Sequence, residues 1–262
     1  ERDASELALR VPLGTASQAL KGWWDPEVWN SLHPALELAK SLGRNDALLP
    51  ILTALAFNVL TQGRISEAYH WVRETLETAE ATDDPDLRVA GHMIASCYYF
   101  FVGSPAEVLA HAARVEVLYD RDKHRHLVEL LNIDPKTMAG CYAAICTWIL
   151  GYPDRAVQLC DGADAHARQH AHPFNIGWAL HIGAHVFEFR NEPEKLRQRT
   201  GACDQLGREN SLPLLWARMA PEAYRRTLVR EGKPAEGVDP EGLGPAGLGD
   251  IRGRMPDAYT KA

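Results

Sequence analysis

A turn recurs along this sequence at nearly constant intervals. At each turn a helix-patterned run of residues stops, and another begins about five residues later. The turns are at Gly22, Gly63, Gly103, Gly151, Asn191 and Gly232, and the intervals between them are 41, 40, 48, 40 and 41 residues. A period of about 34 to 45 residues is typical of stacked helix hairpins, in which each unit buries its apolar face only against its neighbours.

Between the turns, apolar residues repeat with the period of an α-helix. Met138 is followed by apolar Cys141, Tyr142 and Ile145 at i+3, i+4 and i+7. We therefore predict an all-α, right-handed α-solenoid of five to six helix hairpins, similar to tetratricopeptide repeats. This repeat domain is predicted over residues 1–231.

Helix starts are marked by a capping residue followed by proline, which fits the first helical position. The pairs are Asp25-Pro26, Asp84-Pro85 and Asp134-Pro135, and Ser104 to Glu107 has the form of a capping box. Seven residues before each of the first five turns the residue is small, which is what close packing of paired helices requires; before the sixth turn it is Arg225, which breaks the rule. On this ground Ala56, Ala144 and Ala184 are predicted to be buried between helices.

Two segments depart from the period. The 48-residue interval holds Tyr119 to Pro135, rich in charged residues, which we predict to be a polar loop. Its cluster of His124, Arg125 and His126 fits a solvated loop better than an anion site, although these side chains could pair with nearby aspartates. The tail, residues 232–262, has seven Gly and four Pro in 31 residues and is predicted to be irregular.

The first helix of each tetratricopeptide-type hairpin lines the concave side of the superhelix, where peptides usually bind. The positions expected there are unusually apolar. They are either core residues of a tightly curled array or an apolar groove for a partner helix or a small ligand. The candidates for this partner groove are Phe57, Met93, Phe100, Phe101, Trp148, Trp178, His181 and His185.

Two of these groove candidates, His181 and His185, are also of a residue type that binds metal ions. His181, His185 and Glu188 are at i, i+4 and i+7, so on a helix they share one face and could supply metal ligands. Eleven histidines make such a spacing expected by chance, however, and the HExxH motif of zinc hydrolases is absent. There is no phosphate loop and no nucleophile elbow either. We expect no metal, no cofactor and no enzymatic activity for this chain.

The charge and composition of the chain limit the classes of partner that can be expected. The 28 Lys and Arg against 35 Asp and Glu give a net charge of −7, and the basic residues are scattered, so nucleic acid is not an expected partner. The longest nearly apolar run, Met138 to Leu150, is 13 residues, short of the roughly 18 that span a bilayer. The five cysteines form no CxxC pair and are typical of a reducing compartment. We expect a cytoplasmic chain without membrane contact.

Several strings in this sequence resemble one protein family. They are Val11 to Thr15, Leu118 to Asp120 with His124 and Asp134-Pro135, the turn Leu150 to Ala156, and His172 to Phe174. In this order and spacing they are similar to the C-terminal helical-repeat region of large bacterial class III adenylate or guanylate cyclases. Those proteins join a cyclase domain, a STAND-type ATPase and tetratricopeptide-like repeats. The resemblance covers Glu6 to Gly232, and its motifs are turns and helix starts.

The resemblance implies the sensor or scaffold end of a signalling protein. Its repeats would pass partner or ligand binding on to ATPase and cyclase output, while the catalytic carboxylates and the phosphate loop have no counterpart here. The function expected is therefore a non-catalytic scaffold for protein–protein or interdomain contacts. The alternatives are a small-molecule sensor with an apolar concave pocket and, less favoured, a metal-dependent enzyme.

Overall fold

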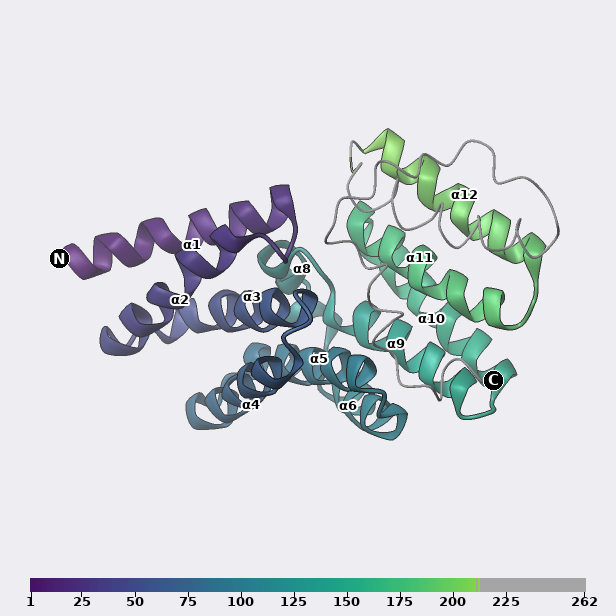
Figure 1. Cartoon of the computed structure of the whole chain (residues 1–262), viewed down its shortest axis with the longest axis horizontal. Coiled ribbons are helices and arrows are strands. Elements are labelled where there is room, and N and C mark those ends of the chain that lie inside the picture. Colours follow the sequence, from purple (N-terminus) through teal and green to yellow (C-terminus); the bar gives the residue numbers. More distant parts are fainter. Residues whose placement is uncertain (211, 213–262) are drawn as a thin grey trace. The chain divides into compact units, whose positions relative to one another are not determined.

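Every regular element in the described part of the chain is helical. The structure is a computed structural model that describes residues 1–210 and 212. Over this range no strand occurs, and helices that follow one another in sequence pack together (Figure 1). The predicted all-α helical-repeat fold is confirmed. The predicted turn at Gly232 and the tail 232–262 lie outside the described residues.

The chain divides into two compact units. The first comprises Glu1–Ser104 and Ala110–Pro135, and the second comprises Pro105–Leu109 and the described residues from Lys136 onward. The helices up to the fourth hairpin are α1 (Arg2–Lys21), α2 (Pro26–Ser41), the short 3-10 helix η1 (Asn45–Ala47), α3 (Leu48–Thr61), α4 (Ile65–Thr82), α5 (Pro85–Val102), α6 (Pro105–Leu118), α7 (Arg121–His124) and α8 (His126–Leu131). They are followed by α9 (Pro135–Ile149), α10 (Pro153–His170), α11 (Pro173–Phe189) and α12 (Pro193–Glu209).

The five predicted turns that lie in the described residues are all found between paired helices. They separate α1 from α2, α3 from α4, α5 from α6, α9 from α10 and α11 from α12. Gly103 ends α5 in the left-handed region, with φ of 80°, where a residue without Cβ has no steric penalty. Asn191 takes the same role before α12, with φ of 57°.

Two helix starts carry the capping bonds that the sequence predicts. Asp25 Oδ1 accepts a hydrogen bond from the Glu27 N–H at 2.9 Å. Asp84 Oδ1 accepts from the first-turn amides of α5 at 2.9 and 3.0 Å. α6 begins at Pro105 as expected, but the Ser104 side chain makes no capping hydrogen bond, so the predicted capping box is wrong. Proline at the first position, which has no N–H to satisfy, is the start signal that remains.

The small residues before the turns are buried. Ala56, Ala144 and Ala184 are at most 1% exposed, in agreement with the predicted close packing of paired helices. No described helix is both long enough and apolar enough to cross a membrane.

The prediction for the segment between α6 and α9 is wrong. Residues 119–135 were expected to form an exposed polar loop, but they contain α7 and α8. Leu127, Val128, Leu131 and Ile133 are buried in this segment. Charged residues dominate the composition of this segment, but its apolar residues are buried and make it part of the core of the first unit.

Candidate functional site

The predicted groove residues fall into two classes by burial. Four of them, Phe57, Met93, Trp178 and His181, are at most 5% exposed. The other four, Phe100, Phe101, Trp148 and His185, are partly exposed. As the structure stands, the first class belongs to the core, and only the second class can touch a partner without rearrangement.

Phe57 is buried because its helix is enclosed on every side. All residues of α3 from Leu48 to Leu60 are buried, whereas the inner helix of an open array would leave one face to the groove. α3 packs against α1, α2, α4 and α5, and α8 packs against it as well. Phe57 also stacks on Trp23, with ring centroids 5.2 Å apart. α8 therefore completes the enclosure of α3.

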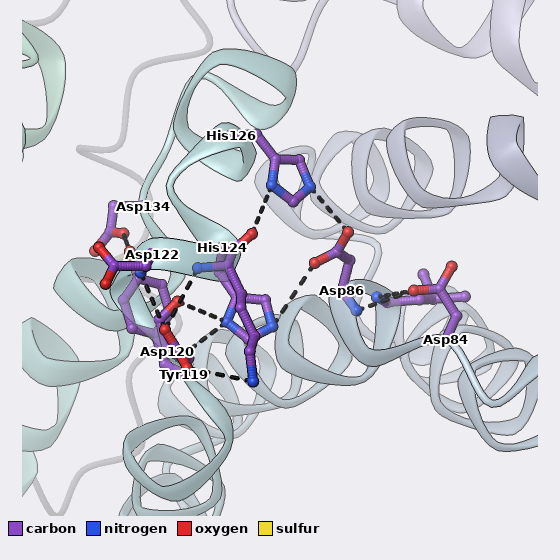
Figure 2. Close-up of polar contacts among 10 residues, drawn as sticks. Asp84, Asp86, Tyr119, Asp120, Asp122, His124, His126 and Asp134 are labelled. Atoms are coloured by element: carbon purple, nitrogen blue, oxygen red, sulfur yellow. Dashed lines mark hydrogen bonds and ion pairs between the residues drawn. The ribbon is translucent and has the colours of Figure 1, made fainter.

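A polar cluster joins the α7–α8 segment to the first turn of α5 (Figure 2). His126 Nε2 lies 2.8 Å from Asp86 Oδ2, and His126 Nδ1 lies 2.8 Å from the Lys123 carbonyl oxygen. A carbonyl and a carboxylate can only accept, so both contacts are hydrogen bonds only when both ring nitrogens carry a proton. His126 thus links the α7–α8 segment to the carboxylate of Asp86, which the N-terminal end of α5 also favours.

His124 lies in the same cluster. It is buried, and the Asp120 amide N–H donates to its Nδ1 at 2.8 Å. The Asp120 carbonyl is 2.9 Å from the same nitrogen, but that oxygen already accepts the His124 backbone N–H. The other ring nitrogen, Nε2, faces Asp86 Oδ1 at 3.7 Å.

Tyr119 fixes the other end of the segment. Its hydroxyl donates to Asp134 Oδ2 at 2.7 Å, and both residues are buried. Burial, followed by the charge of Asp134 and the hydrogen bond to it, raises the pKa of Tyr119. A tyrosine held protonated in this way anchors the segment. The expectation that His126 pairs with an aspartate of its own segment is wrong: the carboxylate it contacts belongs to Asp86, far away in sequence.

The second unit carries an exposed aromatic patch where α9 and α11 end. Trp148 of α9 packs on Phe189 of α11, with ring centroids 4.8 Å apart, and His185 lies 6.3 Å from Phe189. Phe189 is 40% exposed, and Leu150 and Tyr152 of the following turn are 43% and 62% exposed. We call these five residues the aromatic patch. Two of its members, Trp148 and His185, are among the predicted groove candidates.

His181, His185 and Glu188, which the spacing makes conceivable but not favoured as metal ligands, are joined by pairwise contacts. His185 Nδ1 is 3.3 Å from Glu188 Oε2, and the His181 ring meets that of His185 edge to face at 5.3 Å. Burial, followed by the charge of His185, lowers the pKa of His181 well below its usual value, so His181 is neutral. Its Nδ1 is buried without a hydrogen-bond partner among the described residues.

Two features were missed by the sequence reasoning. Asp86 follows the predicted cap Asp84, and only the fold brings it to His126. Leu9, Leu13 and Leu20 of α1 are exposed; their spacing along one helical face could have been noticed in the sequence, but exposure cannot be read from spacing.

Comparison of the chain with protein-family models and with curated proteins finds no match.

Proposed function

We propose that this chain is a non-catalytic helical-repeat scaffold that binds a protein partner through the aromatic patch of its second unit. The observation that supports this proposal is the pair Trp148 and Phe189, which lie on two neighbouring inner helices and remain partly exposed. Contiguous exposed apolar residues mark interaction sites more often than single scattered ones do.

The composition of the patch fits a protein anchor. Tryptophan and neighbouring aromatic side chains are enriched among residues that contribute most to binding, because they bury much area with few rotatable bonds. Beside the patch, Arg190 is paired with Asp154 at 3.1 Å and with Glu192. Charged residues next to apolar ones are common in protein interfaces, where a polar rim surrounds an apolar centre.

The resemblance to cyclase repeat regions extends the proposal to a biological role. The partner would be an interdomain surface or a helix of a bacterial signalling protein that carries a cyclase and a STAND-type ATPase domain, in the cytoplasm. The chain itself would neither cyclise nor hydrolyse nucleotide. A nucleotide-turnover assay on the purified chain tests this part, and activity that copurifies through several steps would contradict it.

Replacing Trp148 by alanine tests the binding role. We expect Trp148→Ala to weaken binding to an isolated ATPase or cyclase domain of that cyclase class by about 2 kcal/mol, roughly 30-fold in Kd. Isothermal titration calorimetry measures the change. Tyr69→Ala is the matched control, since Tyr69 is an aromatic residue of α4, 44% exposed, in the first unit.

The stability of the two variants separates binding from folding. If Trp148 is a core residue, its removal costs about 3–5 kcal/mol of unfolding free energy. A loss of that size, or equal binding by both variants, would contradict the patch as a partner site.

A small-molecule sensor is the second candidate. It is favoured by His181, whose buried Nδ1 has no hydrogen-bond partner among the described residues and could meet a polar group of a ligand. Thermal stabilisation by a small, mainly apolar ligand with one hydrogen-bonding group, lost in His181→Phe, would support this function over the scaffold.

A further inference from the structure

Two histidines lie one helical turn apart on α10 of the second unit. His166 and His170 are four residues apart in this helix, so their side chains share one of its faces. The rings meet edge to face with centroids 4.9 Å apart, and a nitrogen of one ring lies within 4.8 Å of a nitrogen of the other. Both residues are half-buried, so solvent reaches the pair.

We propose that His166 and His170 together bind one divalent transition-metal ion of the zinc, copper or nickel type, whose remaining ligands include water. The proposal is independent of the aromatic patch, and it gives the ion a structural role in the second unit. It departs from the expectation, drawn from the sequence, that the chain holds no metal.

The ligand chemistry selects this class of ion. Imidazole nitrogens bind zinc at about 2.0–2.1 Å, so two of them on a tetrahedral ion lie roughly 3.4 Å apart. Modest rotations of the two side chains bring the nitrogens to that separation. The same spacing of four residues supplies two zinc ligands in the HExxH motif. Magnesium and calcium prefer oxygen ligands and are not expected here.

The end of the helix favours a cation at this place. His170 is the last residue of α10, and the C-terminal end of a helix carries a partial negative charge that stabilises cations within its last turn. Arg168, the basic residue between the two histidines, is ion-paired with Asp164 at 3.1 Å. Its positive charge is therefore offset by a neighbouring carboxylate.

The ion would stabilise the last turn of α10. The helix ends at Ala171, whose φ of 52° puts a residue with a Cβ in the left-handed region. Residues with a side chain are disfavoured there. An ion held by both histidines bridges the turn before Ala171 and keeps it helical. Because the ion binds the folded helix, its binding free energy adds to the stability of the second unit.

Isothermal titration calorimetry of the full chain with Zn²⁺ tests the site, after a chelator has removed any metal. We expect wild type to bind zinc, and His166→Gln and His170→Gln each to raise Kd at least tenfold, since one imidazole is left. His111→Gln is the matched control, because it removes one member of another close pair: His92 and His111 have Nδ1 atoms 2.9 Å apart. The five native cysteines are buried and do not compete.

Three results of the titration would overturn the proposal. They are a wild-type chain that binds no zinc, zinc affinity that survives in both α10 variants, and an equal loss of affinity in His111→Gln. Circular dichroism confirms that all four proteins are folded, and zinc should raise the thermal midpoint of wild type more than that of the two α10 variants.

Electron paramagnetic resonance identifies the ligands directly. Cu²⁺ also binds imidazole nitrogen, so the spectrum of the copper-loaded wild type should show splitting from two nitrogens. The spectra of His166→Gln and His170→Gln should each show splitting from one. A spectrum that is the same in wild type and both variants would show that these histidines are not ligands, and the assignment would be wrong.

Discussion

At residue scale, position 183 in α11 has no room for a side chain. A Cβ there would lie 2.5 Å from Cys160 Sγ and 2.9 Å from Arg199 Nη1. Cys160 is buried in α10, and Arg199 of α12 is held by Asp161 at 2.9 Å. Glycine is what lets these three helices approach one another.

Gly183→Ala should therefore destabilise the protein by roughly 1–3 kcal/mol, because an extra methyl group in a packed core forces its neighbours apart. Gly162→Ala is the control, since a Cβ at this exposed site of α10 meets nothing within 4 Å. That change should stabilise the helix by about 0.5–1 kcal/mol. Denaturant midpoints measure both, and a shift in the same direction for the two would contradict the packing argument.

The sequence predicts residues of this kind only in part. Ala144 and Ala184 are foreseen as close-packing sites because their distance from a turn repeats with the period. Gly183 has no such regularity, since its role depends on the particular pair Cys160 and Arg199. In the same way His126 is recognisable as a titratable residue, but its partner Asp86 is joined to it only by the fold.

Also at this scale, His92 of α5 and His111 of α6 face each other, with Nδ1 atoms 2.9 Å apart. Burial, followed by the charges of His111 and Arg114, lowers the pKa of His92 to about 4. Unfolded histidine has a pKa near 6.5. Between these values the unfolded chain binds more protons, so this contribution to stability is complete above about pH 6.5 and is lost as the pH falls toward 4.

His92→Gln keeps a hydrogen-bonding group but cannot titrate. The unfolding free energy of this variant should fall less than that of wild type between pH 7 and pH 5, by about 1 kcal/mol after allowance for solvent screening. Urea titrations at the two pH values measure the difference. His33→Gln, at an exposed position of α2, is the control. An unchanged pH dependence in His92→Gln would refute the assignment.

At the scale of elements, the α7–α8 segment is the clearest departure from the sequence prediction. The two faces of α8, a helix of six residues, differ in exposure: Leu127 is fully buried, and Leu130 is 40% exposed. Periodicity is weak over so short a helix, and neighbouring charges conceal it. The longer helices were predictable because their periodicity spans several turns.

Leu127→Ala should cost about 2–5 kcal/mol, as for other buried leucines. Leu130→Ala in the same helix should cost much less. The thermal midpoints of the two variants decide between a core segment and a solvated loop, since a loop would give two small and equal changes.

At the scale of the whole molecule, the repeat order is what the sequence predicts best, because each hairpin contacts mainly its neighbours in the chain. The division into two compact units was not predicted. The division depends on where contacts between residues are most numerous in the folded chain. α6 and α9 resemble the other helices in sequence, yet both have residues on each side of the division.

Stability should follow these units, because in repeat proteins it is the sum of local terms. Leu127→Ala is expected to speed amide hydrogen exchange in α3 and α8, and Gly183→Ala to speed it in α10 and α11. Exchange in the other unit should change little in each case. Faster exchange throughout the chain in both variants would show a single cooperative unit instead.

The burial of every cysteine gives the chain built-in reporters of local opening. Burial raises the pKa of the thiols of Cys146, Cys160 and Cys203 to about 12, 11 and 12, and burial also raises the pKa of Cys97. Almost no thiolate exists at neutral pH, and little reagent can reach the sulfur. Each thiol will react with a labelling reagent only when its own helix opens. The labelling rates therefore measure the local opening of α5, α9, α10 and α12 without any engineered probe.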